Sequence, residues 1–241
     1  MSNPSGFSDF SFDENDDKVG KKTKQFKGKE GETYRVSFVH LPIDASGQPL
    51  LDGKIKFTGC DRHYVQGVGY FLHKGPEYAK LAGGAPKQAV ATILVVWPTT
   101  DKKGKLNADA FSKGEGWQVM PWVFSADRYD QLKRRHEEFP LNTNDITLAC
   151  TDSQYQKMDV SPCKDNLFRK LWESDKERAK AVAKAIFDEV QNVAKGLAQS
   201  IARDMTLDQI REKLGGASAS AGPITGATSE DVDNLLDNLI E

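Results

Sequence analysis

The chain reads AVATILVVW from Ala89 to Trp97, a nearly continuous apolar run that ends at Pro98. A strand buried on both faces has this composition, so the run is predicted to form the central strand of a sheet. Pattern and composition predict further strands at residues 33–39, 54–58, 117–124, 145–151 and 154–160. The strand at 117–124 contains Pro121 and is expected at an edge or a bulge, because proline has no N–H for the strand ladder.

One helix is predicted between two of these strands. Ser125 is a favourable N-cap for residues 126–139, and Pro140 ends the helix. A small barrel of the OB type commonly has a helix between its third and fourth strands. The predicted fold is therefore mainly β with helices: an OB-fold barrel core, a long C-terminal helix and disordered acidic tails. The predicted organisation is a disordered N-terminal arm at 1–31 that is acidic and then basic, the OB-fold core at 32–172, a helical extension at 173–214, and a flexible linker with an acidic tail at 215–241.

The C-terminal third changes from strands to helices. From Ser174 onward, apolar residues recur at three- or four-residue spacing for almost thirty positions, which indicates a long amphipathic helix to residue 203. Ser174 and Glu177 have the spacing of a capping box. Thr206 is predicted to cap a second, shorter helix that ends at Gly215 and Gly216.

The net charge of −2 conceals regions of opposite sign. Residues 1–17 carry five acidic side chains and no basic one, and so do residues 229–241. Residues 18–228 contain the remaining 25 acids and all 33 lysines and arginines, so this body has a net charge of +8. A basic body between acidic ends predicts a polyanionic partner and ends that compete for the same surface. The alternative is that the charged ends serve solubility alone.

Motifs of common enzymes are missing from the sequence. It contains no Gly-rich phosphate loop, no GxSxG elbow and no HExxH pair, so no catalytic activity is expected. Cys60 and His63 have zinc-ligand spacing, but no second such pair exists to complete a tetrahedral site. No metal or other cofactor is therefore predicted, and zinc is the alternative. Three widely spaced cysteines and no long apolar segment favour a soluble protein of a reducing compartment, with no membrane partner.

Nonspecific binding of single-stranded DNA requires cations that follow the phosphates and aromatic rings that stack on the bases. Residues 54–80 interleave both kinds of side chain, and their glycines favour loops that leave rings exposed. The alternative for rings such as Phe71 is that they pack into the core. The contacts to DNA predicted from this stretch are Lys54, Lys56, Arg62, Tyr64, Tyr70, Phe71 and Lys74.

A second basic stretch follows the central strand, where OB barrels place a binding loop. It contributes Lys102, Lys103, Lys105 and Trp117 to the predicted contacts. Tyr155 and Lys157 complete the set, because residues two apart in a strand share one face. The sequence leaves Trp97 and Trp122 open between core positions and stacking positions.

Five segments carry a family resemblance. They are RVSFVHLP at residues 35–42, ATILVV at 91–96, VFSADRYDQL at 123–132, DITLACTD at 145–152 and SEDVDNLLDNLIE at the end of the chain. In this order they resemble the single-stranded-DNA-binding (helix-destabilising) replication proteins of tailed phages.

The resemblance implies an OB-fold core that coats single strands during replication, recombination and repair in the cytoplasm of a bacterial host. It implies a basic N-terminal arm for cooperative self-association along DNA, which Lys21, Lys22 and Lys24 match. It also implies an acidic tail that recruits phage replication and recombination proteins. The tail residues assigned to partners are Asp231, Asp233, Leu235, Leu236, Asp237, Leu239 and Ile240. The best-known members hold zinc in a His/Cys cluster with a CxxC motif, which residues 60–80 lack here.

Two other functions remain open at this stage. The tail and the N-terminal phenylalanines also suit a transcription regulator that contacts RNA polymerase. The second alternative is an RNA-binding OB protein, and nothing in the sequence reads a 2′-hydroxyl.

Overall fold

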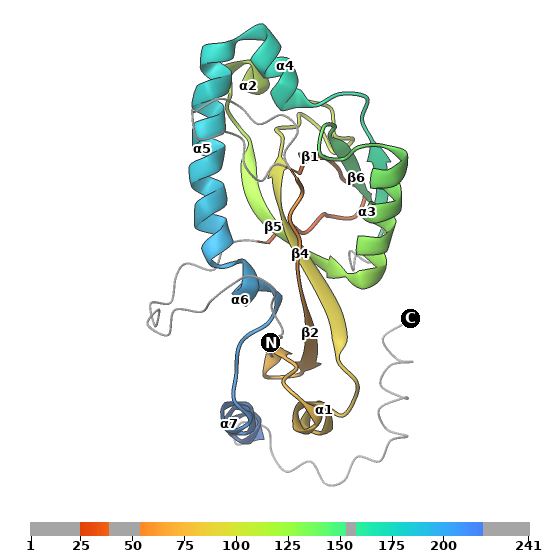
Figure 1. Ribbon diagram of the computed structural model, residues 1–241, viewed down its shortest axis with the longest axis vertical. Coiled ribbons are helices and arrows are strands. Elements are labelled where there is room, and N and C mark those ends of the chain that lie inside the picture. The colour runs from red at the N-terminus through yellow and green to blue at the C-terminus, as the bar shows by residue number, and fades with distance from the viewer. Residues whose placement is uncertain (1–24, 39–53, 153–157, 219–241) are drawn as a thin grey trace.

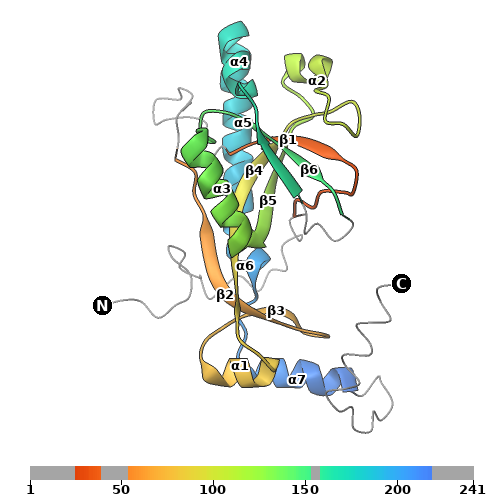
Figure 2. The same cartoon turned by 90° about the vertical axis from the view of Figure 1, so that its right-hand side faces the viewer.

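The computed structural model describes residues 25–38, 54–152 and 158–218, which form a mixed α/β fold with a seven-stranded, mainly antiparallel sheet (Figure 1, Figure 2). The strands are β1 (Thr33–Ser37), β2 (Thr58–Val65), β3 (Gly69–Leu72), β4 (Lys87–Val96), β5 (Gln118–Ser125), β6 (Ile146–Cys150) and β7 (Met158–Pro162). The helices are α1 (Pro76–Ala82), α2 (Ala108–Lys113), α3 (Ala126–Glu138), α4 (Leu167–Ser174), α5 (Lys176–Lys195), α6 (Leu197–Ile201) and α7 (Leu207–Ser218).

The central strand prediction is confirmed by β4. Strand β5 pairs with β4 from Ala89 to Val96, while the opposite edge of β4 is shared by β2 at its start and β1 at its end. Both faces of β4 are buried from Ala89 onward, which explains its nearly continuous apolar run. Ile93 contributes to the core under α5, and Leu94 contributes to the core between β4 and β6.

The first core lies between the sheet and helices α4, α5 and α6. Val182, Ile186 and Val190 of α5 pack there with the β4 side chains. The predicted helix at 174–203 is thus two helices, because the chain turns at Gly196 between α5 and α6. The predicted cap at Ser174 is wrong by one residue. Ser174 ends α4, and the Asp175 carboxylate accepts the capping hydrogen bond from the Arg178 N–H at 3.0 Å.

The second core lies between β1, β4, β5, β6 and β7, and α3 covers it. It contains Leu132 of α3 and also Trp122, which is a core residue like Trp97 in the first core. Helix α3 begins after Ser125 as predicted, although the Ser125 side chain makes no capping bond. Strands β5 and β7 each pair with one other strand, so the described residues form an open sheet and not the closed barrel expected from the sequence.

A third, smaller core joins the β2–β3 hairpin to α1 and α7 (Figure 2). The glycines after residue 58 are expected to favour loops, but Gly67 and Gly69 instead build a tight turn between two strands. Both glycines have positive φ values, 82° and 88°, which other residues rarely adopt. The strand expected at 54–58 is wrong except for its last residue, because residues 54–57 are not in a strand and β2 begins at Thr58.

The remaining expectations for the C-terminal half are met in part. The hairpin expected across residues 145–160 forms as β6 and β7, with β7 displaced toward Pro162. Thr206 caps α7 as predicted, because its hydroxyl accepts a bond from the Gln209 N–H at 3.3 Å. Helix α7 continues past Gly215. Within the described ranges, no helix has the length and hydropathy needed to cross a membrane.

Gly114 is expected to be essential for the close packing of α2 against α5. It ends α2 with φ at 70°, and a Cβ atom there would lie 2.5 Å from Cγ2 of Val182. Gly114→Ala is therefore expected to lower the free energy of unfolding by about 1–3 kcal/mol, measured by urea denaturation. Gly84→Ala is the matched control, because no atom lies within 4 Å of its Cβ position. Equal stability of the two variants would contradict this packing.

Candidate nucleic-acid interface

Two tyrosines stand exposed on one face of the β2–β3 hairpin. Tyr64 of β2 and Tyr70 of β3 lie directly opposite each other across the strands. They are 60 % and 47 % exposed, and among the described residues they are the exposed large hydrophobic side chains. Their ring centroids are 5.0 Å apart with an interplanar angle of 54°. An exposed pair of rings at this spacing offers π-faces to flat partners such as nucleobases.

Arg62 completes this face of the hairpin. Its guanidinium carbon lies 3.8 Å from the centroid of the Tyr70 ring, a cation–π contact, and its Nη1 donates to the Ile201 carbonyl at 2.6 Å. Burial lowers the pKa of Arg62, yet a guanidinium remains charged in proteins. Arg62 therefore fixes the Tyr70 ring and brings a positive charge beside it.

Lys87 lies next to Arg62 and was not among the predicted contacts. Arg62 is paired with Leu72 on one side and with Lys87 of β4 on the other. Directly paired residues point to the same face of a sheet, so Lys87 shares the face of the tyrosines. We call this face, formed by Arg62, Tyr64, Tyr70 and Lys87, the tyrosine platform.

The opposite face of the hairpin is buried, and this corrects the prediction for Phe71. Phe71 is fully buried with Val68, Met205 and Ile210 in the third core. Because successive side chains of a strand point to opposite faces, Phe71 must face away from Tyr70. It supports the platform from below and has no surface on which a base could stack.

The same alternation excludes the suggested zinc pair. Cys60 and His63 are three residues apart in β2, so they lie on opposite faces. Cys60 is buried in the first core, where burial raises the pKa of its thiol to about 11. His63 packs against Phe71 with ring centroids 5.6 Å apart. These two residues cannot bind one ion together, and the described residues contain no cluster of three potential ligands.

His63 instead forms a pair with His73. The His63 Nε2 and His73 Nδ1 atoms are 2.9 Å apart, a distance at which one nitrogen donates and the other accepts. Burial, followed by the nearby His73, lowers the pKa of His63. His63 lies on the face of Phe71, opposite the tyrosines, so the positive charge of the tyrosine platform comes from Arg62 and Lys87.

The free edge of β3 is covered by a segment from the C-terminal part of the chain. The Arg203 N–H donates to the Tyr70 carbonyl at 3.0 Å, and the Arg203 carbonyl accepts from the Leu72 N–H at 3.0 Å. Lys74, a predicted DNA contact, forms an ion pair with the next residue, Asp204. Part of the charge of Lys74 is thus already used to hold this segment.

Lys54 and Lys56 lead into β2 and are both exposed. They alternate with Ile55 and Phe57, which pack against the second core. Their ammonium groups therefore face solvent, as the prediction requires.

The predicted loop after β4 lies at the other end of the molecule. Lys102, Lys103 and Lys105 are exposed beyond the end of β4, whereas the hairpin pairs with its beginning. The ten residues of β4 separate the two regions by about 30 Å. Trp117 also lies near this far end, where its ring packs against the first core and its Nε1 donates to the Gly114 carbonyl at 2.9 Å. The structure thus does not bring these contacts to the tyrosine platform.

Several predicted residues lie outside the described ranges. These are Tyr155 and Lys157, the arm residues Lys21, Lys22 and Lys24, and the tail residues from Asp231 to Ile240. Comparison of the chain with protein-family models, curated proteins and solved structures finds no match. The function is therefore inferred from the side chains described above.

Proposed function

We propose that the chain is a single-stranded-DNA-binding protein that does not select a base sequence. The observation that supports it is the tyrosine platform, in which two exposed rings lie across adjacent strands beside two cations. Single strands expose the faces of their bases, and aromatic rings that stack on them tolerate any base. In a duplex these faces are occupied by neighbouring base pairs, so the same surface favours single strands.

The rigidity of the hairpin also supports this proposal. Its lower face is fixed by a core with α1 and α7, and its edge is joined to Arg203 through two backbone hydrogen bonds. Rings held in place lose little conformational entropy when they bind, which leaves more of the stacking energy for affinity.

We also propose that the strands around the second core derive from an OB barrel. Helix α3 lies between β5 and β6 and covers the core, as the helix of an OB fold does. The Phe26 N–H donates to the Pro121 carbonyl of β5 at 2.8 Å, and the Gly31 N–H donates to the Cys150 carbonyl of β6 at 2.9 Å. Residues 25–31 thus form a link between the two sides of the open sheet.

The wider role is proposed from the resemblance of the sequence. The protein would coat single strands during phage DNA replication, recombination and repair in the bacterial cytoplasm. The basic arm would support self-association along DNA, and the acidic tail would recruit replication and recombination proteins. The basic body of the chain between its acidic ends fits this role.

Binding of a fluorescently labelled oligo-dT, followed by anisotropy, tests the proposed function. Each phosphate contact to a single strand contributes about −0.7 to the slope of log K, the association constant, against log salt. The two cations of the tyrosine platform therefore predict a slope of about −1.4 or steeper. Affinity should therefore fall at least about sevenfold between about 50 and 200 mM salt. Oligo-dA should bind similarly, and duplex DNA should bind far more weakly. Equal affinity for duplex, or no binding of either, would overturn the proposal. Competition by poly-U shows whether RNA is also bound.

A further inference from the structure

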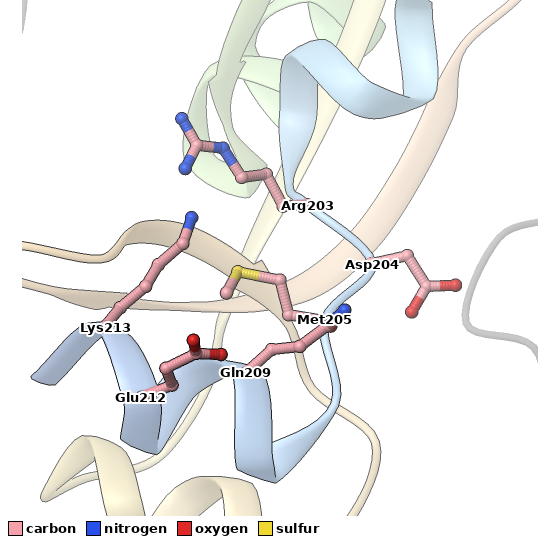
Figure 3. Close-up of a pocket in the computed structure, with 6 residues that line it drawn as sticks. All are labelled: Arg203, Asp204, Met205, Gln209, Glu212 and Lys213. Carbon is pink, nitrogen blue, oxygen red and sulfur yellow. The ribbon is translucent and has the colours of Figure 1, made fainter. Parts of the chain in front are cut away.

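A surface hollow lies beside the tyrosine platform, on the other side of the β3 edge. It has a volume of about 630 Å³ and is lined by Arg203, Asp204, Met205, Gln209, Glu212 and Lys213, from α7 and the segment before it (Figure 3). Arg203 and Lys213 are both exposed. In Figure 3 the cationic ends of these two side chains lie on the same side of the hollow, whereas the Asp204 carboxylate points away from them.

The hollow is continuous with the platform through the backbone of Arg203. Arg203 forms a parallel β-bridge with Phe71, through its backbone hydrogen bonds to Tyr70 and Leu72. It therefore takes the place of a further strand beyond β3. Its side chain extends toward the hairpin turn, where Nη1 lies 3.4 Å from the Val68 carbonyl. Because Arg203 is paired with Phe71, the hollow lies toward the Phe71 face, and a single strand of DNA that leaves the Tyr70 ring reaches it by passing over the backbone of Arg203.

The charges of the hollow favour an anion. Asp204 is paired with Lys74, which leaves Glu212 as the acid that faces the two cations. Among the described residues no ion pair joins Glu212 to Lys213 or Arg203. Neither cation is therefore neutralised by Glu212, the side chain of Arg203 has within the described residues only the 3.4 Å contact of Nη1 with the Val68 carbonyl, and Glu212 opposes an anion held between the two cations.

We propose that this hollow binds the phosphodiester backbone of the single strand where it leaves Tyr70. The inference rests on the proposed function, and it adds a path for the DNA. The single strand of DNA crosses the hairpin from Lys87 over the tyrosines to Arg203 and Lys213. The part of this path from Lys87 to Arg203 covers three inter-strand spacings, or about 14 Å. At a rise of about 3.4 Å or more per nucleotide, that part holds no more than about four nucleotides. Arg and Lys at its end supply charge and no base selectivity.

The test measures oligo-dT affinity as a function of salt for the full chain and its variants. Lys213→Gln is expected to weaken binding about five- to tenfold near 50 mM salt and to reduce the slope by about 0.7, the loss of one phosphate contact. Arg203→Gln should act similarly. Glu212→Gln should have the opposite effect and tighten binding, which a merely structural role of α7 does not explain. Lys184→Gln, at an exposed position on α5, is the control with unchanged slope.

The outcomes separate this inference from the proposed function. If the wild type binds oligo-dT and depends on Tyr64 and Tyr70, but Lys213→Gln and Glu212→Gln both match the wild type, the hollow is not part of the path. If no variant or wild type binds oligo-dT, the proposed function itself fails. Inorganic phosphate at constant ionic strength is a further arm. Displacement that needs a large excess of phosphate over the oligonucleotide agrees with a site for one backbone phosphate, whereas displacement at equal concentration would assign the hollow to the free anion and overturn the proposal.

Discussion

Replacing Tyr64 and Tyr70 together with alanine is expected to weaken oligo-dT binding by at least about 30-fold. Each base stacked on an aromatic ring contributes about 1–3 kcal/mol, so two lost rings cost at least about 2 kcal/mol. Both rings are exposed, and their loss should leave the thermal unfolding midpoint nearly unchanged. Anisotropy titrations of the double variant and both single variants at fixed salt measure the effect.

The matched control keeps the rings and removes the hydroxyl groups. Tyr64→Phe with Tyr70→Phe should retain nearly all of the affinity, because stacking uses the ring face. A loss as large as that of the alanine variant would assign the binding energy to hydrogen bonds from the hydroxyls. Arg62→Gln should show an intermediate loss with a reduced salt slope, since it removes one charge and frees the Tyr70 ring that Arg62 now holds. Full affinity in the alanine variant would exclude the tyrosine platform as the binding site.

The central strand and the long helix of this fold were predictable from the sequence. The run from Ala89 to Trp97 has no polar face, and only a strand covered on both sides satisfies such a run. The three- and four-residue spacing in α5 likewise specified a helix with one buried face. The break at Gly196 was not specified, because the same apolar spacing continues through Leu197 and Ile201 in α6.

Residue type alone predicts only part of the candidate site. Arg62, Tyr64 and Tyr70 were identified by residue type, and a period of two applied to β3 would have placed Phe71 on the buried face. Treating the glycines of this region as loop formers concealed that period. Lys87 and Arg203 reach the hairpin through strand pairing with distant segments, and no local pattern encodes that register. The lysines after β4 were grouped with the hairpin for the same reason: sequence does not show that β4 holds them about 30 Å apart.

Arg35→Met is expected to lower the free energy of unfolding by about 3–5 kcal/mol near pH 8, because it leaves a buried carboxylate without its cation. Asp145 is fully buried and accepts hydrogen bonds from the Ser37 hydroxyl, from Arg35 Nε at 3.1 Å and from the Leu167 N–H at 2.9 Å. This group joins β1 to the loop before β6 and to the start of α4, so its loss loosens both larger cores. Urea denaturation of the variant and the wild type measures the cost.

The loss of unfolding free energy caused by Arg35→Met should increase with pH. Burial raises the pKa of the Asp145 carboxyl from its ordinary value of 3.8 to about 6, against the opposing effect of Arg35. Because the folded-state pKa lies above the unfolded one, the contribution of this group to stability is largest below about pH 4 and is lost as the pH rises through about 6. Without Arg35 the pKa should rise further, so the variant should lose more stability near pH 8 than near pH 5.

A second substitution separates charge from packing. Asn at position 145 is neutral and can still accept the Leu167 N–H, so Arg35→Met combined with Asp145→Asn should be more stable near pH 8 than Arg35→Met alone. The same pair should show strictly additive costs if Arg35 acts only by filling space. Additive costs, or a cost of Arg35→Met that is equal at both pH values, would show that the buried charge of Asp145 does not determine the stability of this junction.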